Sequence, residues 1–139
     1  MTNTIYSNLI RSISQKSMVA SNQAMKDLKI NQQQARVIAY IAENQDKGLI
    51  QKDLAEVFHR RGASITSMLQ GLERNGYIER RIPKDNERQK NLYILPKGLS
   101  IVQQINQIFD KSESNLISSL TENERVELLR ILEKIDQNL

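Results

Sequence analysis

Residues 51–98, QKDLAEVFHRRGASITSMLQGLERNGYIERRIPKDNERQKNLYILPKG, contain the pattern that decides the fold. The spacing of apolar residues predicts four elements in this order: helices over Gln51–Phe58 and Ala63–Asn75, then strands over residues 77–82 and 92–95. Gly76 ends the second helix, and a polar tip at residues 83–90 joins the strands. Two helices around a tight turn, followed by a hairpin, form a winged helix-turn-helix. The predicted fold class is therefore mainly α with a small β-hairpin wing.

The second helix of this motif has the composition of a DNA-reading helix. A helix-turn-helix places its second helix in the major groove of double-stranded DNA. The polar face of this helix consists of Ser64, Thr66, Ser67 and Gln70. The face that we expect to be buried consists of Ile65, Met68, Leu69 and Leu72. Hydroxyl and amide side chains can contact base edges or phosphates, although polar residues also occupy helix faces that only meet water.

The turn before this helix and the tip of the hairpin are basic. Arg60 and Arg61 precede the helix N-terminus, where free backbone amides and the positive end of the helix dipole already favour phosphate. At the hairpin, Lys84, Arg88 and Lys90 are interspersed with acidic residues. Arginine on a narrow loop suits the minor groove, where negative potential is concentrated. The alternative is a solvated hairpin with local ion pairs, which contribute only ~0–1 kcal/mol each.

Charge is distributed unevenly along the 139 residues, whose net charge is +4. Residues 1–50 have six basic and three acidic side chains, and residues 51–98 have ten and six. Residues 99–139 have four basic and seven acidic side chains. The positive excess therefore includes the winged segment, which favours a polyanionic partner.

Composition excludes several classes of site. The chain has no cysteine, which excludes disulfides and thiolate metal sites, and its one histidine, His59, excludes a histidine-rich metal site. We expect no metal, cofactor or catalytic residue, because the chain also lacks a glycine-rich phosphate loop and a nucleophile–base pair. No apolar run reaches the ~18 residues of a membrane span, and no signal peptide is apparent, so we expect a cytoplasmic protein without membrane contact.

Long helices are predicted on both sides of the winged segment. Helical periodicity predicts helices over residues 4–29, 32–44, 96–119 and 122–138. Asn31 is the predicted cap of the second of these, and Thr121 with Glu124 forms a capping box for the last. The terminal helices are apolar over more than one face, which one chain of this length has limited means to cover. We therefore expect a homodimer joined by these helices; a monomer whose ends pack on its own wing is the alternative.

Six elements in this order resemble the MarR family of bacterial transcription regulators, over nearly the whole chain. The matching passages are residues 34–38 (QARVI), 51–55 (QKDLA), 72–78 (LERNGYI), 92–98 (LYILPKG) and 120–124 (LTENE). The resemblance implies a single domain spanning residues 1–139. In it, residues 31–98 form the winged lobe, and residues 1–30 and 99–139 form the dimerisation helices.

The resemblance also implies a function: a homodimeric repressor that binds a pseudo-palindromic operator and releases it when a small molecule or oxidant changes the spacing of the lobes. Three features depart from the family pattern. Asn86 replaces the aspartate that often precedes the wing arginine, here Arg88. Leu95 replaces a threonine that would cap the next helix, and the turn is His59-Arg60-Arg61 instead of glycine–apolar–polar.

Two other classes of protein remain as alternatives. A winged-helix module for protein–protein contact would favour an apolar or acidic recognition face, and Arg60 and Arg61 argue against it. An enzyme lacks any supporting constellation. The effector of a ligand-responsive regulator is not indicated by the sequence. The residues that could line an effector crevice are Tyr6, Met18, Met25, Tyr40 and Phe109, and we expect each to be ordinary core.

Overall fold

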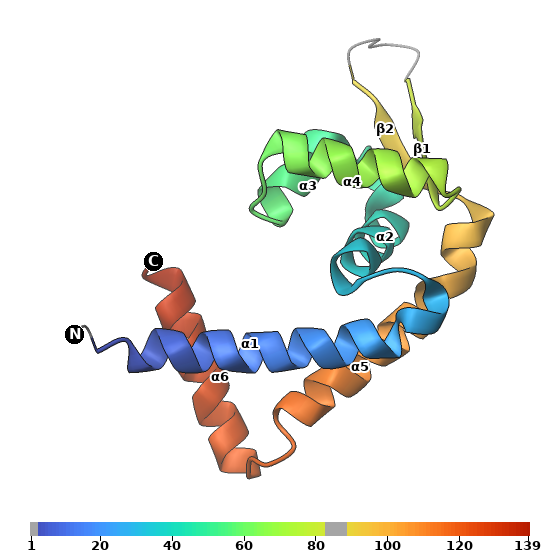
Figure 1. Ribbon diagram of the computed structural model, residues 1–139. Helices are drawn as coiled ribbons and strands as arrows, with labels where there is room; N and C mark the ends of the chain where they lie inside the picture. The colour runs from blue at the N-terminus through green and yellow to red at the C-terminus, as the bar shows by residue number, and fades with distance from the viewer. Residues whose placement is uncertain (1–2, 83–88) are drawn as a thin grey trace.

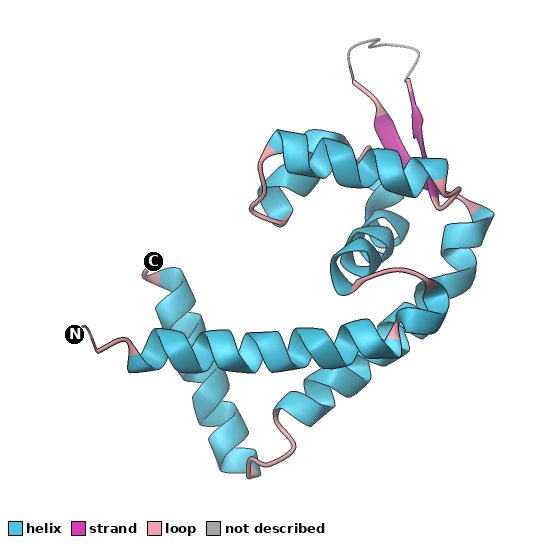
Figure 2. Cartoon of the chain, viewed as in Figure 1, coloured by secondary structure: helices cyan, strands magenta, loops and turns pink. Residues whose placement is uncertain are grey.

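A computed structural model describes residues 3–82 and 89–139 as a helical molecule from which one hairpin projects (Figures 1 and 2). The helices are α1 (Ile5–Ala24), α2 (Gln32–Asn44), α3 (Gln51–Val57), α4 (Gly62–Arg74), α5 (Pro96–Leu116) and α6 (Glu122–Gln137). The strands are β1 (Ile78–Arg81) and β2 (Asn91–Ile94), and the short 3₁₀ turns are η1 (Lys26–Leu28) and η2 (Gln45–Lys47). The expected order of helix-turn-helix, hairpin and long terminal helices is confirmed.

The first helix is shorter than predicted. Apolar spacing predicts one helix over residues 4–29, but α1 ends at Ala24 and η1 follows. Lys29 adopts a left-handed conformation at φ 58°, which an α-helix cannot continue through. This turn buries Met25 completely and leads into α2. Helical periodicity therefore predicted the helix but not the turn that ends it, and within α1 only Ser21 is buried in the single chain.

The core lies in the winged lobe, around α2. Asn31 begins α2 with a capping box, in which its Oδ1 accepts from Gln34 N at 2.8 Å and Gln34 Oε1 accepts from Asn31 N at 2.9 Å. The larger core residues that are fully buried include Ile38, Ile41, Leu54, Leu69, Leu72, Leu92 and Ile105. In α2 the buried residues are Ala35, Val37, Ile38 and Ile41, whereas Ala42 is only half-buried.

The hairpin is joined to α4 through Gly76 and Tyr77. Gly76 has φ 79°, and Tyr77 N donates to Leu72 O at 3.0 Å, which closes the end of α4. The strands are antiparallel, and Ile78 pairs with Ile94 and Arg81 with Asn91. The hairpin therefore projects from the lobe as a wing near the C-terminal end of α4 (Figure 1).

The last two helices form an arm, of which α5 packs against α2 of the lobe while α6 contributes nothing to the core. Pro96 lies in the first turn of α5, which runs beside α1 and ends at Leu116, three residues before its predicted end. Thr121 then begins α6 with the expected capping box: Thr121 Oγ1 accepts from Glu124 N at 3.2 Å. Not one residue of α6 is buried in the single chain. No helix among the described residues is long and apolar enough to cross a membrane.

Candidate DNA-binding surface

The turn between α3 and α4 presents the start of α4 to solvent. His59 is left-handed at φ 50°, and Arg60 N donates to Ala55 O at 3.0 Å, so the chain reverses direction within a few residues. Arg61 then occupies the N-cap position of α4 in an extended conformation, with no side chain capping the helix. The first amides of α4 can therefore bind an anion such as a DNA phosphate.

The two arginines of this turn differ in their surroundings. Arg61 is exposed. Arg60 is half-buried, and its Nη1 donates to Ser64 Oγ at 3.3 Å. The guanidinium of Arg60 thus lies against the first turn of α4, where it can orient Ser64 as well as attract phosphate.

The outer face of α4 carries most of the polar residues expected from the sequence. Ser64, Ser67 and Gln70 are exposed and follow one another at about one helical turn. On the opposite face Ile65, Leu69 and Leu72 are buried, as expected, whereas Met68 is only half-buried. An exposed row of hydroxyl and amide groups on a helix of this width can enter the major groove.

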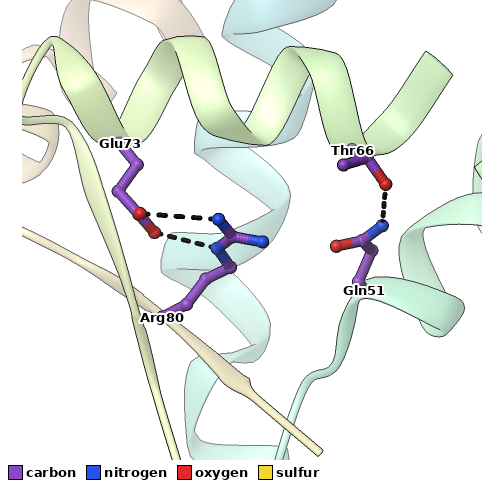
Figure 3. Close-up of polar contacts among 4 residues, drawn as sticks. All are labelled: Gln51, Thr66, Glu73 and Arg80. Carbon is purple, nitrogen blue, oxygen red and sulfur yellow. Dashed lines mark hydrogen bonds and ion pairs between the residues drawn. The ribbon is translucent and has the colours of Figure 1, made fainter. Parts of the chain in front are cut away.

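Thr66 has a second role inside the protein. Its Oγ1 donates to Gly62 O at 2.8 Å and accepts a hydrogen bond from Gln51 Nε2 (Figure 3). This chain of contacts links α3 to the first turn of α4. Thr66 therefore differs from Ser64 and Ser67, whose side chains face outward, because it holds the helix as well as lying near its polar edge.

The wing places further cations beside α4. Lys90 is exposed next to β2, whereas Lys84 and Arg88, together with Asn86, lie outside the described residues. Arg81 was not among the residues predicted from the sequence to contact DNA; it is exposed on β1, and its guanidinium carbon lies 4.4 Å from the centroid of the Tyr93 ring. Strand alternation could have identified it, since Arg80 and Arg81 must point to opposite faces of the hairpin.

An ion pair joins the end of α4 to the wing. Arg80 Nε donates to Glu73 Oε2 at 2.9 Å, and Arg80 Nη2 lies 3.5 Å from Glu73 Oε1 (Figure 3). The side-chain hydrogen bond from Arg80 lowers the pKa of Glu73, and burial opposes this shift only partly. The carboxylate therefore remains ionised and paired at neutral pH.

A large groove lies between the winged lobe and the terminal helices. Its volume is about 1390 Å³, and it opens to solvent. The groove is lined by residues of the lobe and of the arm, among them Arg36, Ile65, Met68, Phe109 and Leu128. The Arg36 guanidinium carbon lies 5.6 Å from the centroid of the Phe109 ring, so one wall combines a cation with an aromatic face.

The residues considered for an effector crevice do not share one environment. Met25 is fully buried core, as expected, and Tyr40 and Phe109 pack against the core while half-buried. The expectation of ordinary core is wrong for Tyr6, which is 82% exposed, and for Met18, which is also exposed. Met18 and Phe109 line the groove.

Comparison with known proteins gives a consistent result. The family model described as "MarR family" matches residues 28–89. A structure from Clostridium acetobutylicum, described as that of a MarR family transcriptional regulator, is 50% identical, covers 99% of this chain and 100% of its own, and has a TM-score of 0.65. The structure of S. aureus MepR in complex with DNA is 30% identical over 96% of this chain and 98% of its own, with a TM-score of 0.92.

A protein of Bacillus subtilis (strain 168) is also similar in sequence. The HTH-type transcriptional regulator YybA is 25% identical over 119 residues, which are 86% of this chain and 78% of that protein. Both the fold and the sequence therefore match regulators along nearly their whole length.

Proposed function

This chain belongs to the MarR family of winged helix-turn-helix transcription regulators, and from that premise we propose that it is a ligand-responsive homodimeric repressor. It is a DNA-binding regulator and not an enzyme. The proposal adds the sequence specificity of binding, the pseudo-palindromic operator, the dimer and the small-molecule response. Because its partner would be chromosomal DNA, we also propose that it acts in the cytoplasm.

The observation that carries the proposal is the exposed face of α4 beside a basic hairpin. Ser64, Ser67 and Gln70 line the outer face of a helix whose N-terminus is uncapped and preceded by Arg61. In our proposal α4 enters the major groove, and the wing, through Arg88, Lys84 and Lys90, contacts the adjacent minor groove or backbone. The relative MepR was solved bound to DNA, which supports DNA binding by this chain.

The terminal helices support a homodimer. In the single chain α6 has no buried residue, and the first half of α1 exposes apolar side chains such as Ile5, Leu9 and Ile13. Exposed apolar surface of this extent marks an interaction site. We propose that residues 1–30 and 99–139 of two chains cover one another, and that the two lobes of residues 31–98 then bind successive half-sites.

The groove supports a small-molecule response. Its lining includes Ile65 and Met68 from the DNA-reading helix and Leu128 from the arm, so a molecule bound there contacts both parts. Such a molecule would shift the equilibrium between lobe spacings by its difference in affinity for them. In our proposal this releases the operator and relieves repression by promoter occlusion.

The experiment that tests this function is binding to the intergenic DNA upstream of the protein's own gene, against a scrambled duplex, across a salt series. We expect selective binding with two subunits per site and an affinity that falls steeply with salt, because released counterions contribute much of the binding free energy. Equal weak binding to both duplexes would contradict sequence specificity. Absence of binding at low salt would favour a protein–protein interaction module instead.

A further inference from the structure

The ion pair between Glu73 and Arg80 connects two elements that the proposed function brings to one DNA site. Among the ion pairs of residues 3–82 and 89–139, it is the one that joins different elements, since Glu79 with Arg81 lies within β1 and Glu127 with Arg130 within α6. The Arg80 side chain is 18% exposed and that of Glu73 39%. The pair is thus partly shielded from water, and its two-pronged geometry restricts both side chains.

The two strands of the hairpin are held by different contacts. β2 is fixed to the segment before α3, because Leu92 N donates to Leu49 O at 2.8 Å and Ile94 N to Gln45 Oε1 at 3.1 Å. β1 is linked to α4 at its start by the backbone hydrogen bond from Tyr77 N to Leu72 O, and along its length by the Arg80 side chain (Figure 3). An isolated two-stranded hairpin is marginally stable in water, so its direction relative to α4 depends on such contacts.

Glu73 has an unfavourable location for a negative charge. It lies in the last turn of α4, where the helix dipole is negative, and on the helix that would approach a polyanion. Neither the helix dipole nor attraction to DNA favours a carboxylate at this position. Its pairing with Arg80 does, because Arg80 offsets the charge and fixes the side chain.

We propose that Glu73 and Arg80 are positioning residues for DNA recognition: their ion pair sets the direction of the wing relative to α4, so that both can bind one DNA site together. Neither residue needs to touch DNA for this role. The inference rests on the proposed function, in which α4 and the wing contact the operator simultaneously.

The variant Glu73→Gln separates the positioning role from the effect of charge, because the two change the affinity for DNA in opposite directions. Removal of a negative charge by itself strengthens binding to any duplex. Loss of the ion pair loosens the wing and weakens binding to the specific operator. We expect about tenfold weaker operator binding for Glu73→Gln, the size of effect associated with one charge-assisted hydrogen bond, while binding to a scrambled duplex is unchanged or tighter.

The matched control is Glu79→Gln. It changes the charge equally and lies on β1, but its partner Arg81 belongs to the same strand, so the link to α4 is intact. We expect operator binding by this variant to equal or exceed that of the wild type. The exchange Glu73→Arg with Arg80→Glu keeps the net charge and restores a pair, and we expect it to recover most of the lost discrimination.

Thermal unfolding and sedimentation of each full-length variant first establish that it folds and assembles as the wild type does, and only then is DNA binding compared. Should Glu73→Gln fail to fold, Arg80→Lys keeps the charge without the two-pronged geometry and serves as the second test. If the wild type prefers the operator to the scrambled duplex and Glu73→Gln binds the operator as tightly as Glu79→Gln does, the positioning role is wrong while the proposed function stands. A wild type that binds neither duplex overturns the proposed function and this inference with it.

Discussion

At the residue scale, Gly98 sets how closely α5 can approach the base of the wing. A Cβ atom at this position would lie 2.4 Å from Tyr77 O and 2.6 Å from Ile94 Cδ1. The Tyr77 carbonyl already accepts from Leu95 N at 2.9 Å, so it cannot move without breaking this bond. We expect Gly98→Ala to lower the free energy of unfolding by about 2 kcal/mol, a typical effect of overpacking, measured by urea unfolding.

The control for this prediction is another helical glycine with free space around it. A Cβ atom at Gly71, inside α4, would come no nearer than 3.9 Å to another side chain. Gly71→Ala should therefore raise the free energy of unfolding by roughly 0.5–1 kcal/mol, since alanine favours the helix. Equal effects of the two substitutions would contradict the packing argument. The sequence could place Gly98 at a helix start, but its contact with Tyr77 depends on tertiary packing.

Residues whose roles follow from local pattern were predicted well, and those whose roles depend on long-range contacts were not. The outward direction of Ser64, Ser67 and Gln70 follows from helical spacing and is confirmed. The contact of Thr66 with Gln51 joins two helices, and the sequence indicates neither the contact nor its partner. The DNA contacts of all these residues remain predictions.

At the element scale, the start of α6 depends on its capping box. Thr121 Oγ1 accepts from Glu124 N at 3.2 Å, and Glu124 Oε1 accepts from Thr121 N at 2.9 Å. Thr121→Ala should destabilise this helix by about 1 kcal/mol, a typical cost of losing an N-cap side chain. We expect the helical circular dichroism signal of Thr121→Ala to be lost at a lower temperature than that of the wild type. Ser118→Ala, whose hydroxyl donates to Asn115 O outside α6, is the control.

The same capping box predicts a dependence on pH. The backbone hydrogen bond from Thr121 lowers the pKa of Glu124 below its ordinary value of 4.5. A group with a lowered folded pKa stabilises the fold above its unfolded pKa, and this contribution is lost as pH falls through the folded value. The melting temperature of the wild type should exceed that of Glu124→Gln at pH 6, with a smaller difference at pH 3. A difference independent of pH would contradict the role of the carboxylate.

The order of elements was predictable because several boundaries have a local chemical signal. Asn31, Gly76, Pro96 and Thr121 mark helix starts and ends as expected. The end of α1 was missed, since Lys29 adopts its left-handed conformation to bury Met25 and start α2, and lysine gives no sequence signal for that conformation. Helical periodicity likewise predicted an end of α5 three residues beyond Leu116, where the helix ends in the structure.

At the scale of the whole molecule, the core and the arm differ in how a single chain covers them. The lobe buries its apolar residues around α2, whereas α6 buries none. The broad apolar pattern of the terminal helices predicted that one chain could not cover them, and this is confirmed for α6. That a second copy covers them is our proposal, and DNA affinity then depends on assembly, because two linked lobes bind two half-sites with a high effective concentration.

This dependence is tested by one charge placed on α6. Leu129 of α6 is 59% exposed in the single chain and Ile82, after β1, is 57% exposed, so exposure alone predicts the same mild effect of glutamate at either position. If α6 is covered by a partner, Leu129→Glu buries an unpaired charge, which is strongly unfavourable, and the dimer dissociates. Ile82→Glu, in the winged lobe and outside residues 1–30 and 99–139, leaves the dimer intact. Sedimentation equilibrium should give half the wild-type mass for Leu129→Glu alone, with operator binding weakened by at least tenfold through lost avidity. A dimeric Leu129→Glu protein with full operator affinity would exclude this face of α6 from the interface.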